Sequence, residues 1–204
     1  MITVYGLPRS RSTRVLWALE ECNQAYTFMP LNFAEGQQRT DHYLSLNPGA
    51  KVPTLVDGDL VLTESGAIVN YVANRYGDHL APSTPADRAH YDRWCYFALT
   101  ELEQPLWTMG KHRFALPAEQ RVAAIMPTAT WEHQKALNLF SQGLDDKPYI
   151  LGDQFSGADI LLGHTLMWGI AFKQPLEQAN LQAYLDRIAQ RPALQRAQAA
   201  EAAG

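Results

Sequence analysis

The sequence contains little cysteine. Only two cysteines, Cys22 and Cys95, occur in 204 residues, and they stand far apart in neither a CxxC nor a metal-ligand spacing. This pattern excludes a disulfide scaffold and a zinc scaffold, and it predicts that no metal is bound. Both cysteines are interpreted as small hydrophobic residues of the core.

Long apolar runs are also missing. The most continuous run, Leu161 to Phe172, is interrupted by His164 and falls short of the roughly 20 residues that span a bilayer. The segment from Met1 to Arg11 holds no apolar run of signal-peptide length and already includes Arg9. The sequence therefore predicts a protein without a membrane span that stays in the cytoplasm.

Positive charge is not in excess. The formal net charge is −4 and the isoelectric point is about 5.8. Because nucleic-acid binders need a cationic face for the phosphates, this balance argues against nucleic acid as a partner. Apolar residues make up 47% and charged residues 19% of the chain, which is typical of a folded globular protein. The length allows one large domain or two small ones.

The first part of the chain alternates strand-like and helix-like segments. Ile2 to Tyr5 and Tyr26 to Leu31 are predicted strands, and a helix with regularly spaced apolar residues begins at Ser12 between them. Two strands joined through a helix form a parallel pair with a right-handed crossover. The order strand, helix, strand thus opens the fold.

A hairpin and a second helix follow. Pro53 to Val56 and Leu60 to Leu62 flank an Asp-Gly-Asp turn, in which the Asp-Gly pair favours the positive φ angles of a tight hairpin. A periodic helix then runs from Thr63 to Tyr76 and ends at Gly77. The first half is therefore predicted as βαβ followed by ββα.

The remainder is predicted to be helical. Ala81 to Pro85 is rich in proline and hydroxyl residues and is interpreted as a linker. The expected domains are 1–78, a linker at 79–86 and a helical domain at 87–204. The Ala/Gln-rich tail from Ala193 is expected to fray. The predicted helical segments are Asp87–Leu106, Pro117–Gly143, Ser156–Phe172 and Leu176–Gln190.

Two serines lie in the turn between the first strand and the first helix. The turn runs from Leu7 to Ser12 and contains Ser10. A helix N-terminus has unpaired N–H groups and a partial positive charge, so it stabilises an anion, and a serine hydroxyl can add one hydrogen bond. A thiol bound there would lose its proton more easily. The alternative is that Ser10 or Ser12 only caps the helix.

Two further segments carry polar groups at the ends of predicted elements. Pro53 heads a strand, where it can adopt the cis form and leave the backbone of Val52 facing outward to pair with a peptide. The alternative is a trans proline on an edge strand. Glu64 and Ser65 open the second helix, where they can hold an amino-acid head group, or Thr63 or Glu64 can simply cap it.

Together these three segments are more specific than any one of them. Ser10 and Ser12, Val52-Pro53 and Glu64-Ser65, in this order and ahead of a helical half, resemble the soluble glutathione transferases. The opening resembles the serine-type branches, including bacterial and fungal members. The resemblance covers essentially the whole chain.

The resemblance extends to two structural segments. Asn47-Pro48 precedes the proline loop, and Gly152 to Asp159 contains a capping box of Ser156 and Asp159. It implies an α/β N-terminal thioredoxin-like domain with a mixed four-stranded sheet. An all-α helical bundle follows as the C-terminal domain.

The resemblance also implies a glutathione site. Val52, ahead of the expected cis-proline Pro53, would bond through its backbone to the cysteinyl part of glutathione. The Glu64-Ser65 pair would hold the γ-glutamyl end, and Lys51 with Gln38 would reach the glycine carboxylate. No nucleotide is implied.

The residue that activates the thiol is left among three candidates. Ser10 is the first choice, Ser12 the second, and Tyr5 at the end of the first strand the third, although a strand aromatic can simply pack in the core. The turn holds no cysteine, which disfavours thiol exchange and dehydroascorbate reduction through a mixed disulfide.

The second substrate is expected on the helices after the linker. Trp107, Phe114, Arg113 and Trp168 are the chosen pocket residues, because aromatic surface and positive charge attract an electrophilic or anionic group. The alternative is that these aromatic side chains, which recur at helical spacing, belong to the core. The other candidates with aromatic, apolar or basic side chains are Tyr91, Trp94, Met109, Lys111 and His112.

The function implied is the conjugation of the glutathione thiolate to a small electrophile, with glutathione as co-substrate, by a homodimer. The alternatives are a glutathione-dependent peroxidase or isomerase on the same scaffold, or a non-catalytic binding protein. Glu101 and Glu103 lie where such proteins often place an acid that reaches the neighbouring subunit, or they belong to a solvated helix face.

Overall fold

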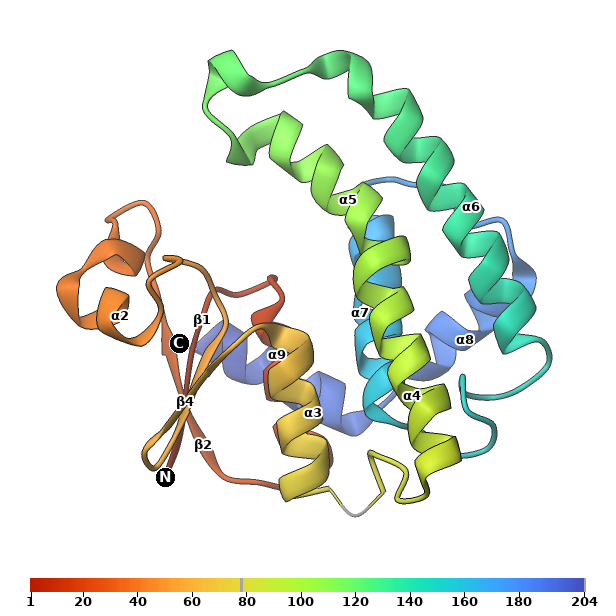
Figure 1. Cartoon of the computed structure of the whole chain (residues 1–204), viewed down its shortest axis with the longest axis horizontal. Helices are drawn as coiled ribbons and strands as arrows, with labels where there is room; N and C mark the ends of the chain where they lie inside the picture. Colours follow the sequence, from red (N-terminus) through yellow and green to blue (C-terminus); the bar gives the residue numbers. More distant parts are fainter. Residues whose placement is uncertain (78, 204) are drawn as a thin grey trace. The chain divides into compact units, whose positions relative to one another are not determined.

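The computed structural model describes residues 1–77 and 79–203 (Figure 1). The chain divides into two compact units, Met1–Ala81 with Ala189–Gly204, and Pro82–Ile188. The boundary expected at residue 78 falls on a residue outside the described part of the chain.

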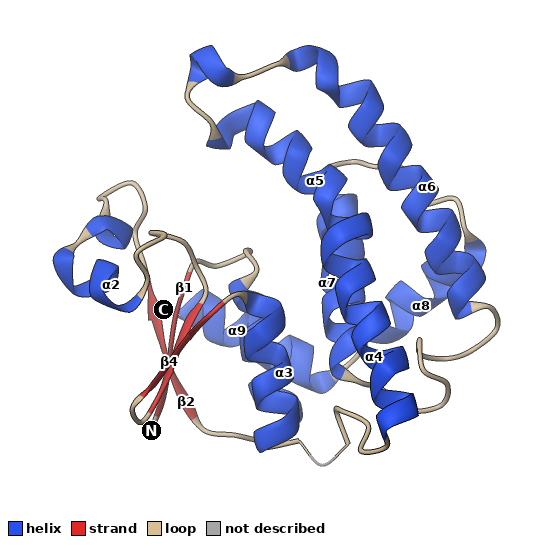
Figure 2. Cartoon of the chain, viewed as in Figure 1, coloured by secondary structure: helices blue, strands red, loops and turns tan. Residues whose placement is uncertain are grey.

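The first unit is built on a four-stranded sheet (Figure 2). Its strands are β1 (Ile2–Gly6), β2 (Tyr26–Pro30), β3 (Thr54–Asp57) and β4 (Leu60–Thr63), in the order β2-β1-β3-β4. β1 pairs parallel with β2 and antiparallel with β3, and β3 pairs antiparallel with β4. The mixed sheet and its parallel opening pair are therefore as the sequence predicts, and Gly58 supplies the positive φ of 60° at the hairpin.

Three helices of the first unit follow the strands β1, β2 and β4. α1 (Ser12–Glu21) and α3 (Ser65–Arg75) bury the apolar residues whose spacing predicted them. α2 (Asp41–Leu46), preceded by the short 3-10 helix η1 (Gln37–Arg39), was not predicted. Six residues are too few for a visible apolar period, and the helix is started locally by the Thr40 hydroxyl, which accepts from the N–H of Tyr43 at 3.3 Å.

The tail that was expected to fray is helix α9 (Pro192–Ala203), so that expectation is wrong. Ala193, Leu194 and Ala197 are buried, and α9 packs on α1. Two ion pairs fix the segment to α1: Arg191 Nε lies 2.6 Å from a Glu21 oxygen, and Arg196 Nε lies 2.6 Å from a Glu20 oxygen.

Residues 189–204 accordingly belong to the first unit and not to the helical one, which differs from the predicted limits of 87–204. Figure 1 shows the blue α9 among the red and yellow elements of this unit. Small alanine side chains let α9 approach α1 closely, and an alanine-rich segment shows little hydrophobic contrast in the sequence alone.

The second unit is helical. α4 (Pro85–Phe97) and α5 (Glu103–Gly110) are connected by the π-helical segment η2 (Ala98–Leu102). A second π-helical segment, η3 (Lys111–Ala115), continues α5. The predicted helix that ended at Leu106 therefore continues to Ala115. The remaining helices of the unit are α6 (Met126–Leu144), α7 (Gly157–Ala171) and α8 (Ala179–Ala189).

The predicted start of α6 at Pro117 is wrong, because the helix begins at Met126. The chain between them forms two short 3-10 turns, η4 (Ala118–Gln120) and η5 (Ala123–Ile125). Pro127 stands in the first turn of α6, where its missing N–H costs nothing.

α7 is the central helix of the second unit, and the capping box predicted at its start is present. One Asp159 oxygen accepts from the Ser156 N–H at 2.9 Å and from its hydroxyl at 2.8 Å. The other accepts from the Ile150 N–H and the Tyr184 hydroxyl, both at 2.9 Å. Asp159 is fully buried, so this carboxylate connects the loop before α7, α7 itself and α8.

In residues 1–77 and 79–203, no helix is long and apolar enough to cross a bilayer.

Candidate functional site

The turn between β1 and α1 brings two serine hydroxyls together. Ser10 Oγ donates to the Leu7 carbonyl at 2.6 Å, lies 3.0 Å from Ser12 Oγ and accepts from the Ser12 N–H at 3.1 Å. Ser12 Oγ accepts from the Leu7 N–H at 3.2 Å. The N-cap position of α1 is occupied by Arg11, so neither serine is the N-cap residue.

The two serines differ in exposure. Ser12 is fully buried, whereas Ser10 is partly open to solvent. A Cβ on Gly6 would lie 2.7 Å from Ser12 Oγ, so the buried hydroxyl packs directly against the strand backbone. Ser10 is therefore the hydroxyl that a ligand beside the turn can reach.

Arg14 connects α1 with the start of α3. This fully buried side chain donates from Nη1 to Ser65 Oγ at 3.2 Å. Its position was not predicted as functional, although a charged residue on the apolar face of a helix is a visible signal. A guanidinium beside Ser65 adds positive charge where a carboxylate would bind.

Glu64 occupies the N-cap position of α3 with a φ of 68°. Its side chain makes no capping bond to the described residues of α3, so the alternative that it merely caps the helix does not hold. A residue other than glycine in this region costs about 1–3 kcal/mol and is found preferentially at ligand sites. Glu64 is exposed and directly precedes the first N–H groups of α3.

The loop before β3 has a cis bond between Val52 and Pro53, as expected. The Lys51 carbonyl accepts from Asn47 Nδ2 at 2.8 Å and from the Tyr43 hydroxyl. The Tyr43 hydroxyl also lies 2.9 Å from Thr54 Oγ1. Tyr43 in α2 and Asn47 at the end of α2 therefore hold this loop in place. The resemblance includes Asn47, whereas no signal in the sequence indicated Tyr43.

Val52 presents its backbone. Within the described residues its N–H and C=O have no hydrogen-bond partner, and its side chain is half-buried. Backbone groups of this kind can pair with an extended peptide as a neighbouring strand would. Lys51, the preceding residue, is exposed.

Gln38 lies on η1, and its Oε1 is buried with no partner among the described residues. A buried amide oxygen without a partner is costly, and such an atom calls for an explanation such as a ligand or a water molecule.

Tyr5, the third candidate for thiol activation, packs against α2. Its hydroxyl lies 3.4 Å from His42 Nε2, and its ring centroid is 5.8 Å from that of Tyr43. Adjacent strand residues point to opposite faces, so Tyr5 points away from the face where Gly6 meets Ser12. This arrangement favours a packing role for Tyr5.

The four pocket residues predicted in the second unit gather around Phe172 at the end of α7. The Phe172 ring centroid lies 5.6 Å from that of Trp168 and 6.3 Å from that of Phe114. Arg113 Cζ is 5.2 Å from the Phe172 centroid. Trp107 and Phe114 each lie 3.5 Å from where a Gly110 Cβ would be, and Phe172 lies 3.6 Å from it.

Phe172 itself was not chosen from the sequence, although it closes the longest apolar run. Phe114 is 60% exposed and Trp168 is half-buried, so this aromatic cluster is open to solvent. Trp94, by contrast, is 6% exposed and packs its ring on Phe97 and Phe140. Trp94 is therefore a core residue.

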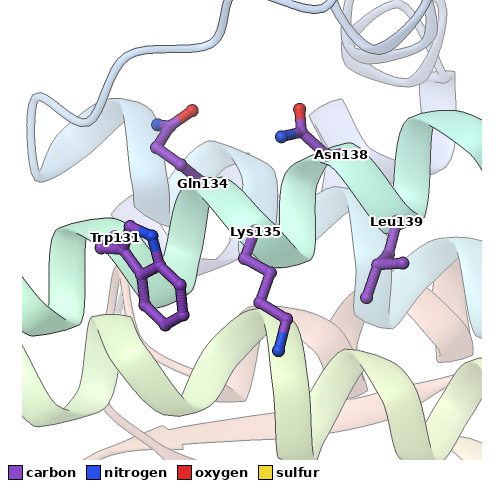
Figure 3. A pocket seen from close by; sticks show the side chains of 5 residues that line it. All are labelled: Trp131, Gln134, Lys135, Asn138 and Leu139. Carbon is purple, nitrogen blue, oxygen red and sulfur yellow. The ribbon is translucent and has the colours of Figure 1, made fainter.

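A shallow hollow of about 350 Å³ lies on α6 (Figure 3). None of the predicted site residues lines it. Lys135 Nζ lies 5.7 Å from the Trp131 ring centroid, within the range of a cation–π contact. Its lining residues all come from this one helix: Trp131, Gln134, Lys135, Asn138 and Leu139. Throughout the described ranges, no group of three or more His, Cys, Asp or Glu side chains could hold a metal ion.

Comparison with known proteins identifies the two halves of the chain. Residues 1–74 match the family model "Glutathione S-transferase, N-terminal domain", and residues 104–192 match "Glutathione S-transferase, C-terminal domain". The chain is 30% identical to glutathione S-transferase GstA of Escherichia coli O157:H7, over 90% of both proteins. It is 29% identical to glutathione S-transferase 3 of Zea mays, over 98% of this chain and 94% of that one.

The solved structures agree. A theta class glutathione S-transferase from Xanthomonas axonopodis pv. citri with glutathione bound is 35% identical and superposes with a TM-score of 0.83, over 96% of both chains. On these matches, the chain belongs to the glutathione S-transferase family.

Proposed function

We propose that this glutathione S-transferase binds glutathione on its first unit, activates the thiol at Ser10 and conjugates it to a small aromatic electrophile. The single observation that carries the site assignment is the buried Arg14–Ser65 contact at 3.2 Å, which links the turn after β1 with the start of α3. The backbone N–H and C=O of Val52, which have no partner among the described residues, support the same site.

The glutathione backbone is matched group by group. Val52 N–H and C=O pair with the cysteinyl residue, in the manner of an added strand. The γ-glutamyl carboxylate binds Ser65 and the N–H groups at the start of α3, near the charge of Arg14. Glu64 accepts from the γ-glutamyl ammonium.

The glycine carboxylate is assigned to Lys51 and Gln38. Lys51 supplies an exposed ammonium. Gln38 supplies an amide whose buried oxygen has no partner within the part of the chain that the structure describes. Exchange of the amide oxygen and nitrogen would turn NH₂ donors toward the carboxylate.

The reaction needs a thiolate at neutral pH. A cysteine thiol has an ordinary pKa of about 8.5, and a fall of about two units would make it mostly ionised. The partial positive charge at the start of α1 and the Ser10 hydroxyl both favour the charged sulfur. The thiolate forms a bond to an electrophilic carbon, whose leaving group departs with the bonding electron pair, while the thiol proton passes to solvent.

The cluster around Phe172 is proposed as the second-substrate surface. Trp107, Phe114 and Trp168 offer ring faces, and Arg113 supplies positive charge beside them. An electron-poor aromatic ring with an anionic or nitro substituent fits this chemistry.

A cytoplasmic homodimer is proposed as the working form. Within the described part of the chain neither Cys22 nor Cys95 is in a disulfide, which suits a reducing compartment. Trp131 is 64% exposed and Leu139 is 43% exposed on α6, which supports association between copies. Light scattering after gel filtration should give twice the chain mass.

The test of the proposed function combines binding and turnover. The protein should be retained on immobilised glutathione, and it should conjugate an activated aryl halide, followed by absorbance of the product. Retention without conjugation, but with peroxide reduction or isomerisation, would select one of the alternative activities. Retention without any turnover would indicate a binding protein.

Ser65→Ala is expected to raise the KM for glutathione by about five- to tenfold and to leave kcat at saturating glutathione within about twofold. The hydroxyl contacts a carboxylate whose charge does not change during the reaction, so the bond contributes equally to ground and transition states. Steady-state kinetics over a glutathione series measure both constants. Ser45→Ala is the control, because Ser45 is an exposed residue of α2 in the same unit. A fall in kcat equal to the fall in kcat/KM would contradict this role.

A further inference from the structure

The last helix of the chain reaches the turn that carries Ser10. Glu201 of α9 accepts from the Arg9 N–H through Oε2 at 3.3 Å and from the Thr13 hydroxyl through Oε1 at 2.7 Å. Glu201 is 6% exposed and Thr13 is 5% exposed, so their contact is buried, whereas the contact with the Arg9 N–H is partly buried. The two oxygens hold residues on either side of Ser10.

We propose that Glu201 is a positioning residue for thiol activation, because its carboxylate holds the turn in the conformation that presents the Ser10 hydroxyl. This inference rests on the proposed role of Ser10. Glu201 does not act on glutathione directly; its effect passes through Arg9 and Thr13.

The conformation of Arg9 explains why the turn needs such support. Arg9 has a φ of 58°, in the left-handed region that residues other than glycine rarely adopt. A strained residue persists where its surroundings hold it in place. The bond from the Arg9 N–H to Glu201 is one such restraint, and Ser10 is the next residue along the chain.

The carboxylate has two opposing effects on a thiolate bound nearby. Its negative charge repels a second anion, which would raise the thiol pKa. Its bonds hold the turn for Ser10, which would lower the thiol pKa. Burial raises the pKa of Glu201 itself, whereas the bonds from Thr13 and Arg9 and the charge of Arg9 lower it.

Two substitutions separate these effects. Glu201→Gln removes the charge but keeps an oxygen for the Arg9 N–H and an NH₂ that can donate to the Thr13 hydroxyl. Glu201→Ala removes both the charge and the bonds. A role through charge alone predicts a lower thiol pKa in both variants. A positioning role predicts a higher thiol pKa in Glu201→Ala and an unchanged or slightly lower thiol pKa in Glu201→Gln.

The experiment titrates the thiolate absorbance of bound glutathione across pH. We expect Glu201→Ala to raise the thiol pKa by about half a unit or more, and to lower kcat/KM about threefold at pH values below the thiol pKa. Glu201→Gln should leave the thiol pKa unchanged or slightly lower. Thr13→Val, which removes one of the two bonds with little change in volume, should shift the pKa in the same direction as Glu201→Ala but less.

Leu194→Ala is the matched control for the stability of α9. Leu194 is buried on the same helix, and its truncation leaves the Glu201 carboxylate in place. With folding verified by circular dichroism, this variant should keep the thiol pKa of the parent protein. An equal rise in Leu194→Ala and Glu201→Ala would overturn the proposal, since general loosening of α9 would then explain both.

The double variant Ser10→Ala/Glu201→Ala decides whether the effect passes through Ser10. It should show no larger pKa rise than Ser10→Ala alone. If Ser10→Ala shifts the pKa and neither Glu201→Ala nor Thr13→Val does, the positioning role is wrong while the proposed function stands. If Ser10→Ala has no effect, the assigned role of Ser10 fails, and the route through Glu201 fails with it.

Discussion

Asp159→Ala is expected to lower the free energy of unfolding by about 3–5 kcal/mol, the largest stability effect anticipated for a single substitution in this chain. The carboxylate accepts from the N–H groups of Ile150 and Ser156 and from the hydroxyls of Ser156 and Tyr184. Alanine would leave the two buried N–H groups without partners, and each costs about 1–3 kcal/mol. Burial raises the pKa of Asp159, because the charged carboxylate is costly to bury. Removal of this cost keeps the loss in the free energy of unfolding below the sum over the lost hydrogen bonds.

Urea unfolding followed by fluorescence and circular dichroism measures this effect. Asp153→Ala, an exposed residue of the same loop, is the control and should change stability by less than about 0.5 kcal/mol. Asp159→Asn keeps the side-chain volume but turns an NH₂ toward hydrogen-bond donors. Its loss of stability should therefore lie between those of Asp159→Ala and Asp153→Ala. A loss below about 1 kcal/mol in Asp159→Ala would show that water replaces the carboxylate.

The elements of the first unit could be predicted because their signals are local. β1, α1 and α3 carry regular apolar spacing, and the Asp57-Gly58 pair specifies a hairpin turn. α9 has no such signal. Two of its four buried residues are alanines, and its position depends on α1 through Glu20 and Glu21, about 170 residues away in sequence.

The candidate site was predictable in its segments and not in its geometry. Turn chemistry pointed to both Ser10 and Ser12, but only burial distinguishes two hydroxyls that stand two positions apart. Arg14 and Tyr43 were missed because their roles arise from contacts across elements, to Ser65 and to the Lys51 carbonyl. Phe172 was missed because its significance depends on which aromatics converge at the end of α7.

The expected effect of Ser12→Ala differs between the sequence-based interpretation and the structure. As an N-cap residue, Ser12 would contribute about 1 kcal/mol to the start of α1. In the structure it is instead the first residue of α1, and its buried hydroxyl accepts from the Leu7 N–H. The substitution leaves that N–H unpaired, so the expected loss is in stability, about 1–3 kcal/mol, and not in thiol ionisation.

Ser10→Ala is expected to raise the apparent pKa of bound glutathione by about 0.5–1.5 units. A hydrogen bond to an ion is worth about 1.5–3 kcal/mol, against about 1 kcal/mol for a neutral pair. The Ser10 hydroxyl has a single proton, which it gives to the Leu7 carbonyl at 2.6 Å in the absence of a ligand. Donation to the thiolate must replace that bond, so the net gain is about 0.5–2 kcal/mol, at about 1.4 kcal/mol per pKa unit.

The thiolate absorbance of bound glutathione across pH measures this shift, and glutathione affinity should stay within a few fold because the neutral thiol loses little. At pH values below the thiol pKa, kcat/KM should fall by the same factor, about three- to thirtyfold. Tyr5→Phe, which removes a hydroxyl that lies beside His42, should leave the thiol pKa unchanged. A shift in Ser12→Ala without one in Ser10→Ala would exchange the roles of the two serines. If neither variant shifts the pKa, the backbone N–H groups at the start of α1 carry the activation alone.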